Sequence, residues 1–122
     1  MEQYEAKVIG VVDGDTVDVI IQLPFDISLK GRIRLFGINA PEMKGASHNA
    51  GLAAKNRMIE LVDQQDVVIE LAHREKEKYG RYLATISKNG VNINEQMIAE
   101  GFAVRYLPLT VEGFVDFAKL LA

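Results

Sequence analysis

Four short polar stretches contain the residue types of a reactive site: residues 13–16, Arg34, residues 39–42 and residues 78–81. Carboxylate and amide oxygens are ligands for hard divalent cations, and the planar guanidinium of an arginine pairs with two phosphate oxygens at once. Each stretch alone has a plain structural explanation, as an Asp-Gly turn, a surface arginine, a loop with a solvated acid or a charged hairpin loop. Together they predict a site for a cation and a phosphodiester, with Arg34 and Arg81 on the phosphate.

The oxygen donors in these stretches suit calcium. Asp15 offers a carboxylate, Asn39 an amide oxygen, and the backbone near Ala40 a carbonyl oxygen, and calcium accepts oxygens of all three kinds. Glu42 follows in the same loop and has the chemistry to orient or deprotonate a water molecule. The sequence therefore predicts a calcium site beside a general base.

The stretch RIRLFGINAPE, residues 32–42, organises the site. In a strand, successive side chains point to opposite faces, so Ile33 and Leu35 face away from Arg34. Pro41 lacks an N–H and cannot continue a central strand, so the chain must turn there. We expect a strand that buries its apolar face and ends beside the polar groups of the loop.

The remaining pattern predicts several short strands and three helices. The strands are expected at residues 5–12 and 16–23 around an Asp-Gly turn, at 31–37 and 67–71, and at 82–87 and 91–93 around Asn89-Gly90. Helical spacing predicts helices over about 48–62, over 94–100 with Asn94 as N-cap, and over about 110–121. These elements indicate an α+β domain, built on a small, partly open antiparallel barrel of the OB type with five strands.

Composition indicates a single domain over residues 1–122. A hydrophobic content of 48% with 25% charged residues is ordinary for a globular chain, and the absence of cysteine excludes disulfides and thiolate sites. A net charge of −3 excludes a global basic field, so an anionic substrate needs a local patch. No apolar run approaches the roughly 20 residues of a membrane span, and no membrane partner is expected. As given, the chain is expected to be cytoplasmic, or extracellular if a signal segment was removed.

Five motifs, in order, resemble the staphylococcal nuclease (thermonuclease) family. They are DGDTV at residues 13–17, RLFGINAPE at 34–42, KYGR at 78–81, NGVNINE at 89–95 and EGFA at 100–103. The similarity runs from about residue 7 to 106. The resemblance implies a calcium-dependent endonuclease on an OB-fold barrel, which cuts DNA and RNA with little sequence preference and leaves 3′-phosphate ends.

The resemblance also implies a role for individual residues around the metal. The residue matching Asp15 ligates calcium, the residue matching Ala40 ligates it through its backbone carbonyl, and Glu42 matches the glutamate proposed to activate the attacking water. The position of Asn39 is normally a second aspartate ligand. An amide carries no formal charge, so we expect a weaker calcium site here.

On the substrate side, the resemblance places Arg34 and Arg81 on the reacting phosphate. Lys78 and Tyr79 match residues that hold a terminal phosphate of the bound nucleotide, and Tyr106 is assigned to base stacking. A monomer is expected, with a dimer through the helix at 110–121 as the alternative.

Two other classes of function stay open from the sequence. One is a noncatalytic OB-fold module that binds nucleic acid, and the other is a barrel that binds a small molecule or a protein. His48 and His73 lie apart, without metal-ligand spacing, and are assigned structural roles.

Overall fold

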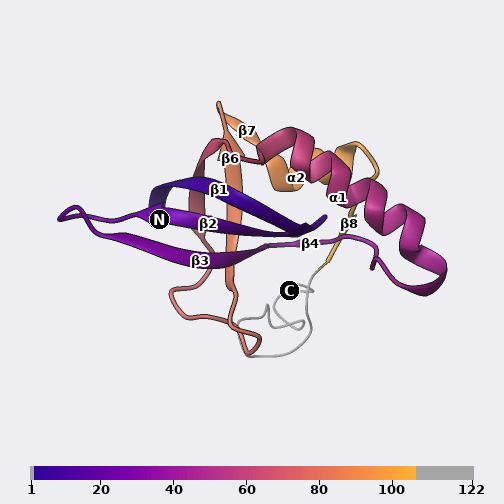
Figure 1. Cartoon of the computed structure of the whole chain (residues 1–122), viewed down its shortest axis with the longest axis horizontal. Coiled ribbons are helices and arrows are strands. Elements are labelled where there is room, and N and C mark those ends of the chain that lie inside the picture. The colour runs from indigo at the N-terminus through magenta and orange to yellow at the C-terminus, as the bar shows by residue number, and fades with distance from the viewer. Residues whose placement is uncertain (1, 107–122) are drawn as a thin grey trace, which may run out of the picture.

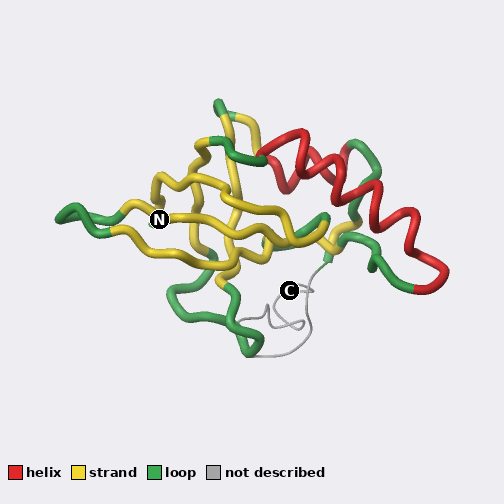
Figure 2. Tube along the Cα trace, in the orientation of Figure 1, coloured by secondary structure: helices red, strands yellow, loops and turns green. Residues whose placement is uncertain are grey.

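Five strands of the chain close into a barrel, and two α-helices pack on one side of it (Figures 1 and 2). The computed structural model describes residues 2–106. In chain order the elements are β1 (Gln3–Asp13), β2 (Thr16–Gln22), β3 (Ser28–Leu35), β4 (Ile38–Asn39), the 3-10 turn η1 (Gly45–Ser47), α1 (His48–Val62), β5 (Asp66–Leu71), β6 (Tyr82–Lys88), β7 (Val91–Asn92), α2 (Ile93–Ala99) and β8 (Val104–Arg105).

Barrel closure depends on one parallel strand pair. Strands β3, β2, β1, β5 and β6 follow one another as antiparallel neighbours, and β6 then pairs with β3 in parallel, with Arg34 opposite Leu83. The predicted α+β, five-stranded OB-type barrel is thus confirmed, although the sequence pointed to a partly open antiparallel sheet. The predicted helix at 110–121 lies outside the described residues, which contain two α-helices.

Alternation along the strands fills the barrel. Ile33 and Leu35 are fully buried while Arg34 lies on the other face of β3, as the sequence pattern predicts. Full burial of such a large aliphatic side chain contributes about 1.5–3 kcal/mol. The barrel residues buried with them are Ala6, Val8, Val17, Val19, Ile21, Val67, Ile69, Ala84 and Ile86.

Helix α1 has the predicted bounds and buries one narrow face. Its buried residues are Gly51, Ala54, Met58 and Val62, at spacings of three and four. Two of these four are very small, and at Gly51 and Ala54 the helix comes close to the loop after β4 and to the turn between β1 and β2.

The start of α2 differs from the prediction. The N-cap is Asn92, whose side chain accepts a hydrogen bond from the Glu95 N–H at 3.0 Å. Asn94, predicted as the cap, lies inside the helix and is buried. Both asparagines fit the N-cap preference, so local pattern alone did not separate them.

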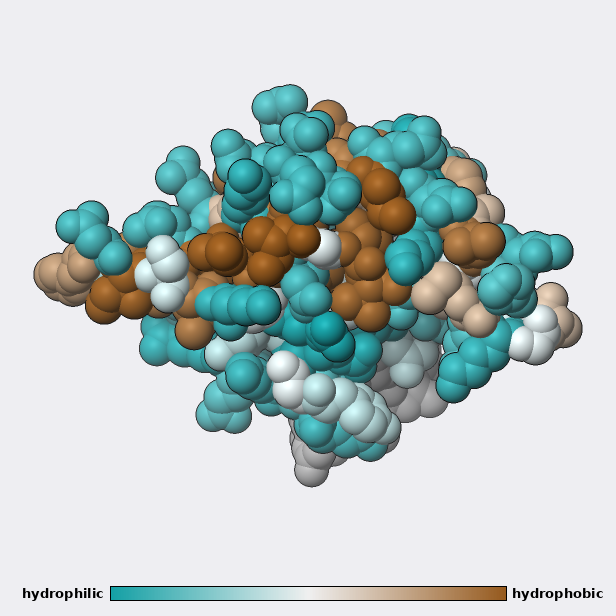
Figure 3. Space-filling model, viewed as in Figure 1, coloured by the Kyte–Doolittle hydropathy of each residue, from teal (hydrophilic) through white to brown (hydrophobic). Residues whose placement is uncertain are grey.

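The hairpin between β2 and β3 carries apolar side chains on its surface, and Figure 3 shows them as a band at that end of the molecule. Phe25, at the tip, is 92% exposed. Asp15 and the hairpin lie at opposite ends of β2, so the hairpin takes no part in the polar site. Neither described helix is long and apolar enough to cross a membrane.

Candidate active site

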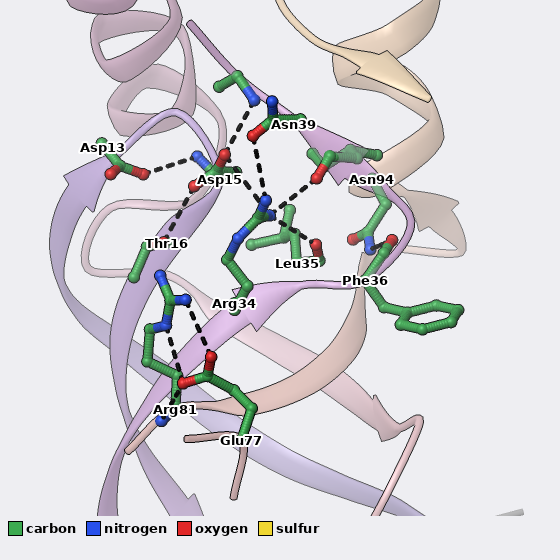
Figure 4. A network of polar contacts seen from close by, with 12 residues as sticks. Asp13, Asp15, Thr16, Arg34, Leu35, Phe36, Asn39, Glu77, Arg81 and Asn94 are labelled. Carbon is green, nitrogen blue, oxygen red and sulfur yellow. Dashed lines mark hydrogen bonds and ion pairs between the residues drawn. The ribbon is translucent and has the colours of Figure 1, made fainter. Parts of the chain in front are cut away.

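Arg34 is held in one orientation at the end of β3 (Figure 4). Its Nη1 donates hydrogen bonds to the backbone oxygens of Leu35 at 3.0 Å and Ile38 at 2.8 Å, and its Nη2 donates to Asn39 Oδ1 at 3.3 Å. Nη1 also lies 3.5 Å from Asp15 Oδ2, and only 12% of the arginine side chain is exposed. The tight turn from β3 to β4 supplies the carbonyl groups that fix this guanidinium.

Asp15 is the buried acid of the site. Its Oδ1 accepts a hydrogen bond from Thr16 Oγ1 at 3.0 Å, and its Oδ2 accepts one from the Ala40 N–H at 2.8 Å. The Asp15 N–H in turn donates to Asp13 Oδ1 at 3.0 Å, which brings both acids of the β1–β2 turn to the same place. The turn after β1 and the loop after β4 are therefore joined through one carboxylate.

The charge of Asp15 is poorly compensated. Burial raises the pKa of this carboxyl, and Asp13 raises it further, whereas Arg34 and the Ala40 N–H act in the opposite direction; the result is a pKa of about 6. A buried carboxylate in this state would gain from a second cation beside it.

Small residues let α1 pack closely against the turn between β1 and β2 and against the loop after β4. A Cβ on Gly14 would lie 2.6 Å from the Ala54 Cβ and 2.8 Å from the Ala40 Cβ. A Cβ on Gly51 would lie 2.6 Å from the Glu42 backbone oxygen. All three distances are far below van der Waals contact, so glycine is required at each of the two positions for this packing.

Glu42 lies in the loop after β4, and its side chain is exposed to solvent. Its backbone oxygen accepts a hydrogen bond from Ser47 Oγ at 2.6 Å. Its side chain is exposed and takes part in no hydrogen bond or ion pair with any other residue between 2 and 106. The carboxylate is therefore free to bind a water molecule.

The buried side chain of Asn94 links strand β6 to the turn after β3 through hydrogen bonds. Its Oδ1 accepts from the Ile86 N–H at 3.0 Å, and its Nδ2 donates to the Phe36 oxygen at 2.9 Å and the Ala84 oxygen at 3.3 Å. All of its polar atoms are satisfied in a buried position, which makes such a contact specific. Asn94 thus fixes the turn that positions Arg34.

Arg81 enters the site from the loop before β6. Its Nε and Nη2 donate to the two carboxylate oxygens of Glu77 at 3.1 and 3.0 Å. Glu77 raises the pKa of this guanidinium, burial lowers it, and Asp15 and Asp13 add smaller raising contributions. Figure 4 shows the Arg81 guanidinium on the side of the site where the β1–β2 turn carries Asp15 and Thr16.

The predicted substrate residues lie around this centre. Tyr79 is 70% exposed, with Lys78 Nζ at 5.1 Å and the Arg81 guanidinium carbon at 5.4 Å from its ring centroid. Tyr106 is half-exposed, and its N–H donates to the Gly37 oxygen at 2.8 Å, beside the β3–β4 turn. Both tyrosines are accessible for contact with a ligand.

The structure brings Asp15, Arg34, Asn39 and Ala40 into direct contact, with Arg81 nearby. Sequence reasoning assigned no role to Glu77. The sequence feature that could have indicated its pairing with Arg81 is an acidic residue placed four positions before that arginine in a basic loop.

The donors present fit calcium in kind. Asp15 Oδ2 and Asn39 Oδ1 both lie against the Arg34 guanidinium, at Nη1 and Nη2 respectively, and both are hard ligands. Among residues 2–106, no three acidic or histidine side chains form a group that could hold a metal ion. A bound cation would therefore depend on amide and backbone oxygens as well as on Asp15.

Comparison with known proteins gives one family. The family described as staphylococcal nuclease homologue matches residues 32–113 of the chain. The chain is 30% identical to a protein named micrococcal nuclease from Shigella flexneri, over 84% of this chain and 59% of that protein. It is 32% identical to an uncharacterized endonuclease from Haemophilus influenzae, over 86% of this chain and 54% of that protein. An uncharacterized protein from Methanocaldococcus jannaschii is 30% identical over 87% of this chain and 61% of its own length. The chain thus spans little more than half the length of these relatives.

Proposed function

The chain belongs to the family of staphylococcal nuclease homologues, and from this premise we propose that it is a calcium-dependent endonuclease acting on DNA and RNA. It would hydrolyse phosphodiester bonds with little sequence preference and leave 3′-phosphate ends. The observation that carries the proposal is the contact of Arg34 with both Asp15 and Asn39, beside Arg81. Relatives named nuclease and endonuclease support the same reaction class.

The arginines would hold the reacting phosphate. Arg34 is oriented by the carbonyl groups of Leu35 and Ile38, and Arg81 by Glu77. Negative charge on the phosphate oxygens grows as phosphorus gains a fifth oxygen, so donors that are already fixed stabilise the transition state more than the ground state. These two residues should therefore act mainly on turnover.

Asp15, Asn39 and the Ala40 carbonyl would hold calcium at the buried edge of the site. When bound, the ion would supply Lewis-acid polarisation of a non-bridging phosphate oxygen. The raised pKa of Asp15, which reflects a buried and poorly compensated charge, supports a cation at this place.

Glu42 would take a proton from the attacking water. Its carboxylate is exposed and is used by no other residue in the described part of the chain, while its backbone is held by Ser47 and packed on Gly51. A free carboxylate on a fixed backbone suits a general base that must align water for in-line attack. Lys78, Tyr79 and Tyr106 would contact the flanking nucleotides.

A noncatalytic module that binds nucleic acid is the second candidate. It is favoured by Asn39, which leaves the proposed metal site with one negative charge fewer than a second aspartate would give. This candidate predicts binding without cleavage at every calcium concentration.

Nicking of supercoiled plasmid and cleavage of single-stranded RNA, with calcium and with chelator, test the proposal. We expect cleavage only with calcium, and products whose 3′ ends become substrates for extension only after phosphatase treatment. Glu42→Gln should abolish cleavage, whereas Glu5→Gln, at an exposed position of β1, should leave it unchanged. Binding with no cleavage would establish the second candidate instead.

A further inference from the structure

The loop between β5 and β6 closes around the carboxylate of Glu77. Its Oε1 accepts hydrogen bonds from the Tyr79 N–H at 2.9 Å, the Arg81 N–H at 3.0 Å and Arg81 Nε at 3.1 Å, and its Oε2 accepts from Arg81 Nη2 at 3.0 Å. The Glu77 side chain is 15% exposed, in a loop whose other side chains before Arg81 are exposed. Four donors thus converge on one carboxylate.

The backbone of the loop holds these donors in place. The Glu77 N–H donates to the Arg81 oxygen at 2.7 Å, and the Gly80 N–H donates to the Glu77 oxygen at 2.9 Å. Gly80 has a φ of +79°, a left-handed conformation that favours glycine. Burial tends to raise the pKa of Glu77, but the bonds from Arg81 and Tyr79 outweigh it and hold that pKa below its usual range. We call this closed unit of residues 77–81 the Glu77 clasp.

The clasp uses only one edge of the Arg81 guanidinium. Nε and Nη2 face Glu77, whereas Nη1 makes no hydrogen bond to any residue that the structure describes. In Figure 4, Glu77 lies on the side of Arg81 away from Asp15 and Thr16. A phosphate bound beside Asp15 would therefore contact Nη1 of Arg81, while Nε and Nη2 stay bonded to Glu77.

We propose that Glu77 is a positioning residue for the cleavage reaction: it keeps hold of Arg81 while Arg81 contacts the phosphate through Nη1. The inference rests on the proposed function for the role of Arg81. A free arginine loses rotamer freedom when it is ordered on a phosphate, and the clasp removes that loss before substrate binds. The benefit appears in the transition state, where placement of the guanidinium matters most.

The opposite arrangement has a distinct signature. If the Glu77 carboxylate occupied the place of the phosphate and had to be displaced, Arg81 would leave Glu77 on binding. Removal of the Glu77 charge would then raise activity rather than lower it.

Steady-state cleavage by Glu77→Gln tests the direction of the effect. We expect kcat to fall about tenfold with little change in KM, because fixed placement is lost while the arginine remains. Glu75→Gln, which removes an exposed acid from the same loop, should behave as wild type. A rise in kcat, or a fall no larger than in Glu75→Gln, overturns the proposal.

A double variant separates positioning from general support of the fold. If Glu77 acts through Arg81, then adding Glu77→Gln to Arg81→Lys should reduce kcat no further. A merely structural role for Glu77 would reduce kcat again by the same factor in the double variant, and would overturn the proposal.

NMR of the Arg81 Nε–H tests the clasp without any cleavage. This proton should exchange slowly with water in wild type and rapidly in Glu77→Gln. Inorganic phosphate, titrated without calcium, should shift the Arg81 resonances while the Nε–H stays protected. Loss of protection on phosphate binding, or no shift at all, overturns the proposal. A wild-type protein that cuts no nucleic acid but keeps Arg81 protected with phosphate bound would refute the nuclease function alone.

Discussion

Gly51 of α1 packs directly on the Glu42 peptide: a Cβ added to Gly51 would lie 2.6 Å from the Glu42 backbone oxygen and 2.8 Å from the Met43 nitrogen. A glycine inside a helix lowers the stability of that helix by about 0.5–1 kcal/mol relative to alanine. The close approach explains why glycine is nevertheless suited to this position. The helix thereby sets the position of the proposed general base.

Gly51→Ala should displace the loop that carries Glu42. Because the obstacle is backbone rather than a flexible side chain, we expect a loss of about 1–3 kcal/mol in unfolding free energy, together with reduced cleavage. Gly10→Ala is the matched control, since a Cβ there meets nothing within 4 Å. Urea unfolding measures the first effect. A Gly51→Ala variant more stable than wild type, as helix propensity alone would give, would contradict the packing argument.

Arg34→Lys and Arg81→Lys should both be severely damaging to turnover, by about a hundredfold or more, although the charge remains. Lysine cannot reproduce the planar fork that donates to several oxygens at once. KM should change much less. Arg32→Lys serves as control. Arg32 lies on β3, as Arg34 does, but it pairs with Asp18 of β2 at the surface. A near-normal kcat in Arg34→Lys or Arg81→Lys would contradict the assignment of that arginine to the reacting phosphate.

Asn39→Asp should tighten calcium binding by about tenfold, because it adds a negative ligand next to Asp15. Isothermal titration calorimetry of calcium measures this without reference to cleavage. Asn49→Asp, in the exposed first turn of α1, adds the same charge elsewhere and should leave the affinity unchanged. Equal calcium affinity in wild type and Asn39→Asp would place Asn39 away from the metal.

Asp15 should make calcium-free stability depend on pH. Its pKa rises from 3.8 to about 6 in the folded protein, so the folded state binds more protons than the unfolded state between these values. The contribution of Asp15 to the free energy of unfolding should therefore fall as pH rises through this window, by about 3 kcal/mol at most.

Asp15→Asn should remove this slope and unfold at higher urea than wild type near pH 7 without calcium. Calcium should then stabilise wild type but not the variant. Asp26→Asn, at the exposed tip of the β2–β3 hairpin, controls for the loss of one carboxylate. Other carboxyls with lowered pKa values, such as Glu100, stabilise the fold as pH rises, so the decisive quantity is the difference between wild type and Asp15→Asn. If wild type gained stability relative to this variant from about pH 4 to about pH 6, the unfavourable burial of Asp15 would be contradicted.

Local pattern was sufficient for much of the fold. Period-two alternation correctly placed Ile33 and Leu35 in the core and Arg34 outside it, and the predicted bounds of α1 match those observed. The pattern failed at Asn94, which sequence reasoning assigned to a helix cap. Its three backbone partners come from β6 and from the turn after β3, so only tertiary contact reveals its role.

The sequence by itself determined where the chain alternates and turns, which polar residues stand at the ends of strands, and, through its ordered motifs, the family. The tertiary structure decided that β6 pairs in parallel with β3, which brings the loop of Arg81 to the strand of Arg34. It also decided that Glu77 holds Arg81 and that Gly51 supports Glu42. The physical reason is that side-chain direction follows from local periodicity, whereas pairing between distant strands depends on closing the whole barrel and on burial shared by all of its core residues.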